Sequence, residues 1–248
     1  MPVHVRRPLW ATLTSRRATA LAVALAANLL PAAPPAHAAT TTFANTTPII
    51  IPATGTGGQG GRPSNPYPSP ITVSGVASPI TKVTVTLVNY SHGFPDDVGV
   101  IVVSPAGKKI RLMSDVGAGP GAANGDVAAN LTLTFDDAGP SLPDTSALTS
   151  GTFRPTRGNG NAALLEGFRG PGELPRARAA GPYSLLLGDL IGDSANGVWN
   201  LYVIDDTSRD TGTFAGGWAL NITTARWRGW RWRRRQQQPR GLRPEQRR

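Results

Sequence analysis

Residues 197–224 constrain the fold most, because they contain two segments of alternating side chains, each with one tryptophan. Bulky apolar side chains recur at every second position along residues 199–203 and again along residues 218–222, and an acidic connection rich in glycine and threonine joins the two segments. A side-chain period of two is typical of β-strands with one buried face. The stretch therefore predicts a β-hairpin, with Trp199 and Trp218 packed in or beside the core as structural residues.

Similar strand patterns recur at short intervals through the middle of the chain. Residues 80–89 alternate cleanly, whereas residues 98–104 are almost wholly apolar, which predicts a central strand covered on both faces. Further strands are expected at residues 48–52, 71–76, 108–113, 130–135 and 183–187. Since no long helix separates the strands, parallel crossovers are not expected. The sequence therefore predicts an all-β fold, a jelly-roll β-sandwich of about eight to nine mainly antiparallel strands.

The formal net charge of +10 comes from the two ends of the chain. Residues 1–38 carry four arginines and no acid, and residues 226–248 carry ten arginines and one acid, which leaves −3 for residues 39–225. The folded part is thus mildly acidic, so the charge gives no reason to expect it to bind nucleic acid. The chain has no cysteine, which excludes disulfides and thiolate metal sites.

The N-terminus has the pattern of a secretory signal. Arginines precede an apolar run at residues 18–30, and Ala36 and Ala38 supply small residues at the −3 and −1 positions of a cleavage site. The run is too short to be a membrane span. We expect a signal peptide over residues 1–38, of Sec rather than twin-arginine type, a short linker over residues 39–46, and export from a bacterial cell.

The C-terminal residues 225–248 differ sharply in composition from the rest of the chain. Arginines alternate there with Trp227, Trp230 and Trp232. We expect a disordered tail that binds no specific partner. Two alternatives stay open: non-specific binding to anionic surfaces through charge and stacking, or an out-of-frame extension.

The sequence offers little for catalysis. His4 and His37 lie in the expected signal, so His92 is the histidine that a Ser-His-Asp triad would have to use. The chain has neither a Gly-x-Ser-x-Gly elbow nor a His-Glu-x-x-His zinc motif. His92 at a strand end is therefore interpreted as a structural residue, and no catalytic residue is assigned.

Paired aspartates at strand ends suggest a cation site instead. Calcium prefers several carboxylate and carbonyl oxygens, and an exported protein meets millimolar calcium. The alternative is that these side chains cap turns through local hydrogen bonds. The candidate calcium ligands are Asp96, Asp97, Asp136, Asp137, Asp205, Asp206 and Asp210.

Several motifs occur in the order found in one known family. Residues 83–87 (VTVTL) are followed by Ser91-His92, then by Asp96-Asp97-Val98, then by Ser104-Pro105-Ala106-Gly107. The second half contributes the Gly197-x-Trp199-x-Leu201 pattern, Asp210-x-Gly212 and Trp218-x-Leu220-x-Ile222, with residues 151–155 (GTFRP) between the halves. Over residues 47–224 the chain resembles the P domain (P/Homo B domain) of the proprotein convertases and kexin-like proteases, in its bacterial, secreted, stand-alone form.

This resemblance implies a jelly-roll sandwich without catalytic residues, of the kind that follows a subtilisin-like catalytic domain and stabilises it. A protein partner is then expected, either such a protease or a component of the cell surface. Two other functions stay open: a part in serine-type endopeptidase activity by family association, and calcium-dependent cell-surface adhesion.

Overall fold

The computed structural model describes residues 37–51, 62–77, 79–117, 127–159, 182–206 and 210–226. Most of the expected signal peptide and of the C-terminal tail lies outside these residues. Within the described ranges the fold is all-β, without an α-helix and so without a helix that could cross a membrane. Its elements are β1 (His37–Asn45), β2 (Ile49–Ile51), β3 (Arg62–Pro63), β4 (Ser69–Val73), β5 (Ile80–His92), η1 (Pro95–Asp97), β6 (Val98–Val103), β7 (Lys109–Ser114), β8 (Ala128–Phe135), β9 (Gly151–Phe153), β10 (Thr156–Arg157), η2 (Leu187–Leu190), β11 (Gly197–Asp205), β12 (Gly212–Phe214) and β13 (Trp218–Arg226), where η marks a 3-10 turn.

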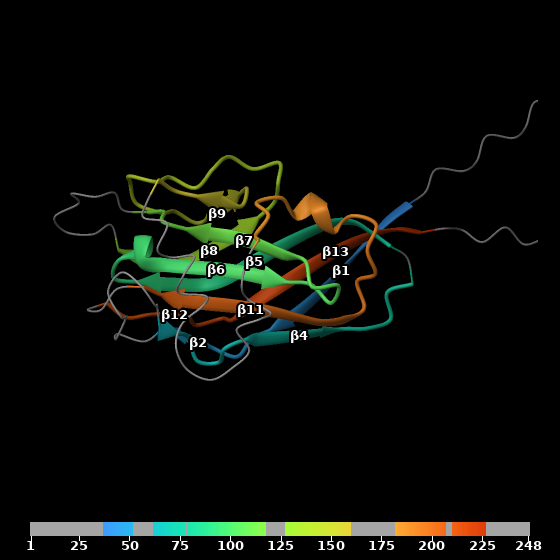
Figure 1. Cartoon of the computed structure of the whole chain (residues 1–248), viewed down its shortest axis with the longest axis horizontal. Helices are drawn as coiled ribbons and strands as arrows, with labels where there is room; N and C mark the ends of the chain where they lie inside the picture. Colours follow the sequence, from blue (N-terminus) through green and yellow to red (C-terminus); the bar gives the residue numbers. More distant parts are fainter. Residues whose placement is uncertain are drawn as a thin grey trace, which may run out of the picture. The chain divides into compact units, whose positions relative to one another are not determined.

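The larger sheet is built around β5, a strand of 13 residues. One edge of β5 pairs with β13 and then with β12, and the other edge pairs with β8, which in turn pairs with β9. β1 pairs with β13 along its whole length, as Figure 1 shows, and β2 pairs with β12. All these pairings are antiparallel except that of β8 with β9.

The smaller sheet has the order β10-β7-β6-β11, and β3 and β4 both pair with the far edge of β11. Only the pairing of β10 with β7 is parallel among these strands. Every residue of β6 is buried. This confirms the expectation of a central strand at residues 98–104, because one face of β6 and β11 meets the main core and the other meets a second apolar cluster. That second cluster contains Ile101, Val103, Tyr202 and Ile204, with Tyr67 and Tyr183 packed against it.

The main core lies between the two sheets and consists mostly of branched aliphatic side chains. Trp199 of β11 and Trp218 of β13 are its largest members, with 0% and 1% of their surfaces exposed. Each buried indole N–H has a partner: Trp199 Nε1 donates to the carbonyl of Ala195 at 2.9 Å, and Trp218 Nε1 donates to Ser69 Oγ at 3.1 Å. Both rings therefore contribute apolar area without an unsatisfied donor.

The two tryptophan strands do not form a hairpin, which corrects the expectation for residues 197–224. β11 belongs to the smaller sheet and β13 to the larger one. The chain crosses between the sheets after β11, and β12 then joins β5 and β2. Alternation predicts that each strand has a buried face, but it does not say which strand lies alongside, and that choice is made by contacts distant in sequence.

Two further segments differ from the expectations. Residues 39–46, expected as a linker, lie largely in β1, whose register runs from the pair His37–Arg226 to the pair Asn45–Trp218. Residues 183–187, expected as a strand, contribute only an isolated bridge from Ser184 to Ile110 before η2 begins. The sandwich thus begins closer to the N-terminus than the sequence pattern indicates.

Candidate metal centre

Three aspartates meet where η1 leads into β6 and where β11 ends. Asp205 lies opposite Val98 in the antiparallel register, and the backbone N–H of Asp206 donates to the carbonyl of Asp97 at 3.0 Å. One carboxylate oxygen from each of Asp97, Asp205 and Asp206 lies within 4.8 Å of the other two. We call these residues the aspartate triplet.

Local sequence explains how Asp97 is held in the triplet. Pro95 begins η1, a position where proline loses no hydrogen bond, and the N–H of Asp97 closes the turn on the carbonyl of Phe94 at 3.2 Å. Asp97 is 9% exposed and Asp205 is fully buried. Oxygen ligands on two sequence-distant segments, partly shielded from water, are the chemistry that suits a hard divalent cation.

The larger sheet faces the triplet with two polar rings from the end of β5. His92 Nε2 lies 3.6 Å from Asp205 Oδ2, and neither side chain is exposed. His92 Nδ1 lies 3.0 Å from the carbonyl oxygen of Phe94, next to η1. Tyr90, two residues earlier on the same face of β5, is also fully buried. Burial and the nearby charges of Asp205 and Asp97 raise the pKa of Tyr90 well above its ordinary value.

Further carboxylates surround Asp96, beside the triplet. Burial and the charges of Asp115, Asp144 and Asp206 raise the pKa of Asp96 to about 6. The pKa of Asp115 is also raised, mainly by burial. Asp115 and Asp144 belong to no Asp-Asp pair, so the sequence pattern did not point to them. The position of Asp115 immediately after β7 is the one signal that would have pointed to it.

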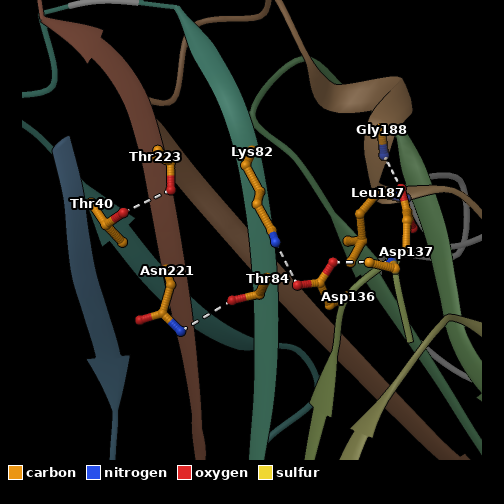
Figure 2. A network of polar contacts seen from close by, with 10 residues as sticks. Thr40, Lys82, Thr84, Asp136, Asp137, Leu187, Gly188, Asn221 and Thr223 are labelled. Atoms are coloured by element: carbon orange, nitrogen blue, oxygen red, sulfur yellow. Dashed lines mark hydrogen bonds and ion pairs between the residues drawn. The ribbon is translucent and has the colours of Figure 1, made fainter. Parts of the chain in front are cut away.

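Asp136 and Asp137 have partners outside the triplet, as Figure 2 shows. Asp136 Oδ2 pairs with Lys82 Nζ at 2.6 Å, and this contact holds the pKa of Asp136 below its usual range despite partial burial. Lys82 and His92 are ten residues apart on β5, roughly 30 Å for an extended strand. These two aspartates therefore occupy the opposite end of the sheet from the triplet.

Asp137 acts as a cap for η2. Its carboxylate accepts hydrogen bonds from the backbone N–H groups of Leu187 at 2.9 Å and Gly188 at 2.7 Å (Figure 2). Amide groups in the first turn of a helix lack partners within the helix, so a carboxylate there stabilises it. This is the local capping role that the sequence analysis kept as the alternative to calcium.

Replacing Asp137 with alanine should therefore lower the free energy of unfolding by about 1–2 kcal/mol, because two amide groups lose their acceptor. The matched change Lys82→Met removes an ion pair whose lysine is half exposed, and it should cost less than about 1 kcal/mol. Urea denaturation followed by tryptophan fluorescence measures both values. A larger loss for Lys82→Met would contradict the assignment.

Asp210 also lies outside the triplet but close to His92. Its carboxylate packs against Gly93, where an added Cβ would come within 2.6 Å of Asp210 Oδ1. The backbone N–H of Gly93 donates to the carbonyl of Thr211 at 3.3 Å. Of the seven predicted calcium ligands, the structure thus groups three in the triplet, with Asp96 beside them and Asp210 against the turn that follows β5.

A surface hollow lies beyond the other end of β6. It has a volume of about 610 Å³ and is lined in part by Lys108, Lys109, Tyr183 and Asp189. Lys108 Nζ donates to the carbonyl of Asp189 at 2.6 Å and pairs with Asp193 at 2.9 Å. Lys108 is thus already engaged within the fold, and the aspartate triplet is the better candidate site.

Comparison with known proteins finds a likeness among solved structures but none among protein families or curated sequences. No family profile matches the chain, and no curated protein sequence matches it. Among solved structures, the chain is similar to the serine protease of Aeromonas sobria, with 15% identity and a TM-score of 0.33, over 79% of this chain and 28% of that one. The complex of that protease with its chaperone ORF2 gives 14% identity and a TM-score of 0.35, over 78% and 28%. The likeness is weak, and the chain spans less than a third of the protease.

Proposed function

We propose that this chain is an exported, non-catalytic β-sandwich module of P-domain type, with jelly-roll topology, which binds and stabilises a subtilisin-like serine protease. The proposal that the module is not catalytic rests on the burial of His92. The resemblance of residues 47–224 to the P domain supports the kind of partner. The tail contributes no specific binding, and the partner of the folded module is a protein rather than a nucleic acid.

The His92 side chain is closed off from solvent, so a substrate could not reach it. Its residue surface is 2% exposed, and an added Cβ at Gly212 on the neighbouring strand would come within 2.2 Å of His92 Cδ2. Ser91 is adjacent in sequence, but successive strand residues point to opposite faces. Ser91 Oγ accepts a hydrogen bond from the N–H of Asn130 at 2.9 Å instead. The Ser-His pair is therefore explained by strand pairing and core formation rather than by nucleophilic catalysis.

The proposed role predicts a direct, stabilising complex. The full chain should co-elute in size-exclusion chromatography with a subtilisin-like protease purified from the medium of the same cells, after inactivation by a serine-directed reagent. It should also raise the melting temperature of that protease. The matched control is a chain heated until irreversibly unfolded. Separate elution with an unchanged melting temperature would exclude the stabilising role.

A calcium-dependent adhesion module is the second candidate, because the aspartate triplet provides a cation-binding geometry. It predicts that the chain binds to intact cells in the presence of Ca²⁺ and is released by EDTA. Binding to the protease that EDTA leaves unchanged would favour the first function, and cell binding without protease binding would favour the second.

A further inference from the structure

The aspartate triplet brings carboxylate oxygens from two sequence-distant segments together, with one oxygen of each residue within 4.8 Å of the other two. Such a set of oxygens is the kind of ligand that a hard divalent cation prefers. Asp97 and Asp205 lie in a nearly closed environment, so their carboxylates are largely shielded from bulk water.

A second observation, independent of the carboxylates, comes from the facing sheet. Tyr90 Oη is fully buried and has no hydrogen-bond partner among the described residues, and the same holds for His92 Nε2. His92 Nε2 is directed at Asp205, 3.6 Å from Oδ2, which is longer than a good hydrogen bond. Tyr90 lies two residues before His92 on the same face of β5, so its ring is buried at the same end of the strand. A buried ring nitrogen of the larger sheet thus faces the triplet of the smaller sheet, with a buried hydroxyl two residues earlier on the same strand.

We propose that Asp97, Asp205 and Asp206 bind one calcium ion, and that Tyr90 and His92 complete the site from the opposite sheet, through the tyrosine hydroxyl or through water held by the ion. Calcium fits this set better than the alternatives. It accepts irregular arrangements of six to eight oxygen ligands, whereas magnesium demands near-ideal octahedral geometry and zinc prefers nitrogen and sulfur.

Such an ion would tie the two sheets together at one end of the sandwich. Asp97 enters β6 and Asp205 ends β11, both in the smaller sheet, while Tyr90 and His92 end β5 of the larger sheet. The exposed Arg62, which lies opposite Asp205 on β3, is a rival source of positive charge. The two explanations differ in whether stability depends on calcium.

The test uses the full chain, freed of metal by EDTA, in a thermal denaturation series with CaCl₂, MgCl₂ or ZnCl₂. With Ca²⁺ at about 100 times its dissociation constant, the melting temperature should rise by about 5–10 °C, and Mg²⁺ should give a smaller rise. Asp206→Asn keeps the shape of the side chain and should abolish most of the rise. Asp136→Asn makes the same change of charge at the other end of β5 and should leave the rise intact.

A measurement on the unmodified chain tests the proposal even if a variant fails to fold. Tb³⁺ substitutes for Ca²⁺, and its emission should be sensitised by the neighbouring tyrosine and displaced by CaCl₂. A melting temperature that responds neither to Ca²⁺ nor to EDTA would overturn the proposal and favour neutralisation by the chain itself. An equal response in Asp206→Asn, or a response to Zn²⁺ alone, would also overturn it. None of these results depends on whether the protease complex forms.

Discussion

Replacing Trp199 with alanine should lower the free energy of unfolding by about 3–5 kcal/mol. The indole is fully buried between the sheets, and its removal leaves a cavity that β11, paired on both edges, cannot close by moving. The carbonyl of Ala195, a residue that is itself buried, also loses its donor. Since domains of this kind are stable by about 5–15 kcal/mol, the loss is a large fraction of the total.

The matched control for this change is Val198→Ala, one residue earlier on the same strand. The Val198 side chain points to the other face and is 46% exposed, so its truncation should cost no more than about 1 kcal/mol. Urea denaturation followed by circular dichroism measures both variants without relying on the tryptophan signal. Similar losses for the two variants would contradict the placement of Trp199 in the core.

Gly217→Ala should have the second large effect, because two costs coincide at this position. Gly217 lies between β12 and β13 with a φ of +67°, and an added Cβ would come within 2.0 Å of the backbone oxygen of Asn45 in β1. The left-handed conformation costs an L-residue about 1–2 kcal/mol. Displacing the backbone of β1 should add about 1–3 kcal/mol.

Gly75→Ala separates these two costs. Gly75 has a similar φ of +76°, but an added Cβ there meets no atom within 4 Å. It should therefore show the conformational cost alone, and the excess loss in Gly217→Ala measures the contact with β1. Equal losses, measured by urea denaturation, would mean that β1 does not pack against this turn and that residues 39–46 are a linker after all.

The sequence alone predicts the strands well where burial sets a simple pattern. β5 shows the alternation expected of a strand with one face on the core, and β6 is apolar throughout because apolar clusters cover both of its faces. The pairing of the strands could not be predicted in the same way. β11 and β13 have matching patterns, yet they lie in different sheets, because the partner of a strand is decided by contacts many residues away.

The candidate site could likewise be predicted only in part from the sequence. Asp205 and Asp206 stand out in the sequence as an acidic pair at a strand end, and so do Asp136 and Asp137. Only the register between β6 and β11 reveals that the first pair meets Asp97. Tyr90 gives no signal in the sequence, since a tyrosine in an alternating strand is most simply a core residue. Whether the Tyr90 ring faces the triplet depends on how the two sheets stack.

β1 was missed for a related reason. Its threonines and alanines have little apolar alternation, so the segment has no obvious buried face. It is held instead by its full-length pairing with β13 and by side-chain contacts such as Thr40 Oγ1 with Thr223 Oγ1 at 2.8 Å (Figure 2). Cross-strand hydroxyl pairs of this kind stabilise an exposed sheet face, but they are recognisable only once the partner strand is known.

The most direct test of the proposed function is a time course of casein hydrolysis at a temperature that inactivates the secreted subtilisin-like protease. Three samples are compared: the purified chain, the active protease, and the two together. The account predicts no hydrolysis by the chain alone and a longer half-life of activity in the mixture than for the protease alone. Hydrolysis by the chain alone, blocked by a serine-directed inhibitor, or an unchanged half-life in the mixture would contradict it.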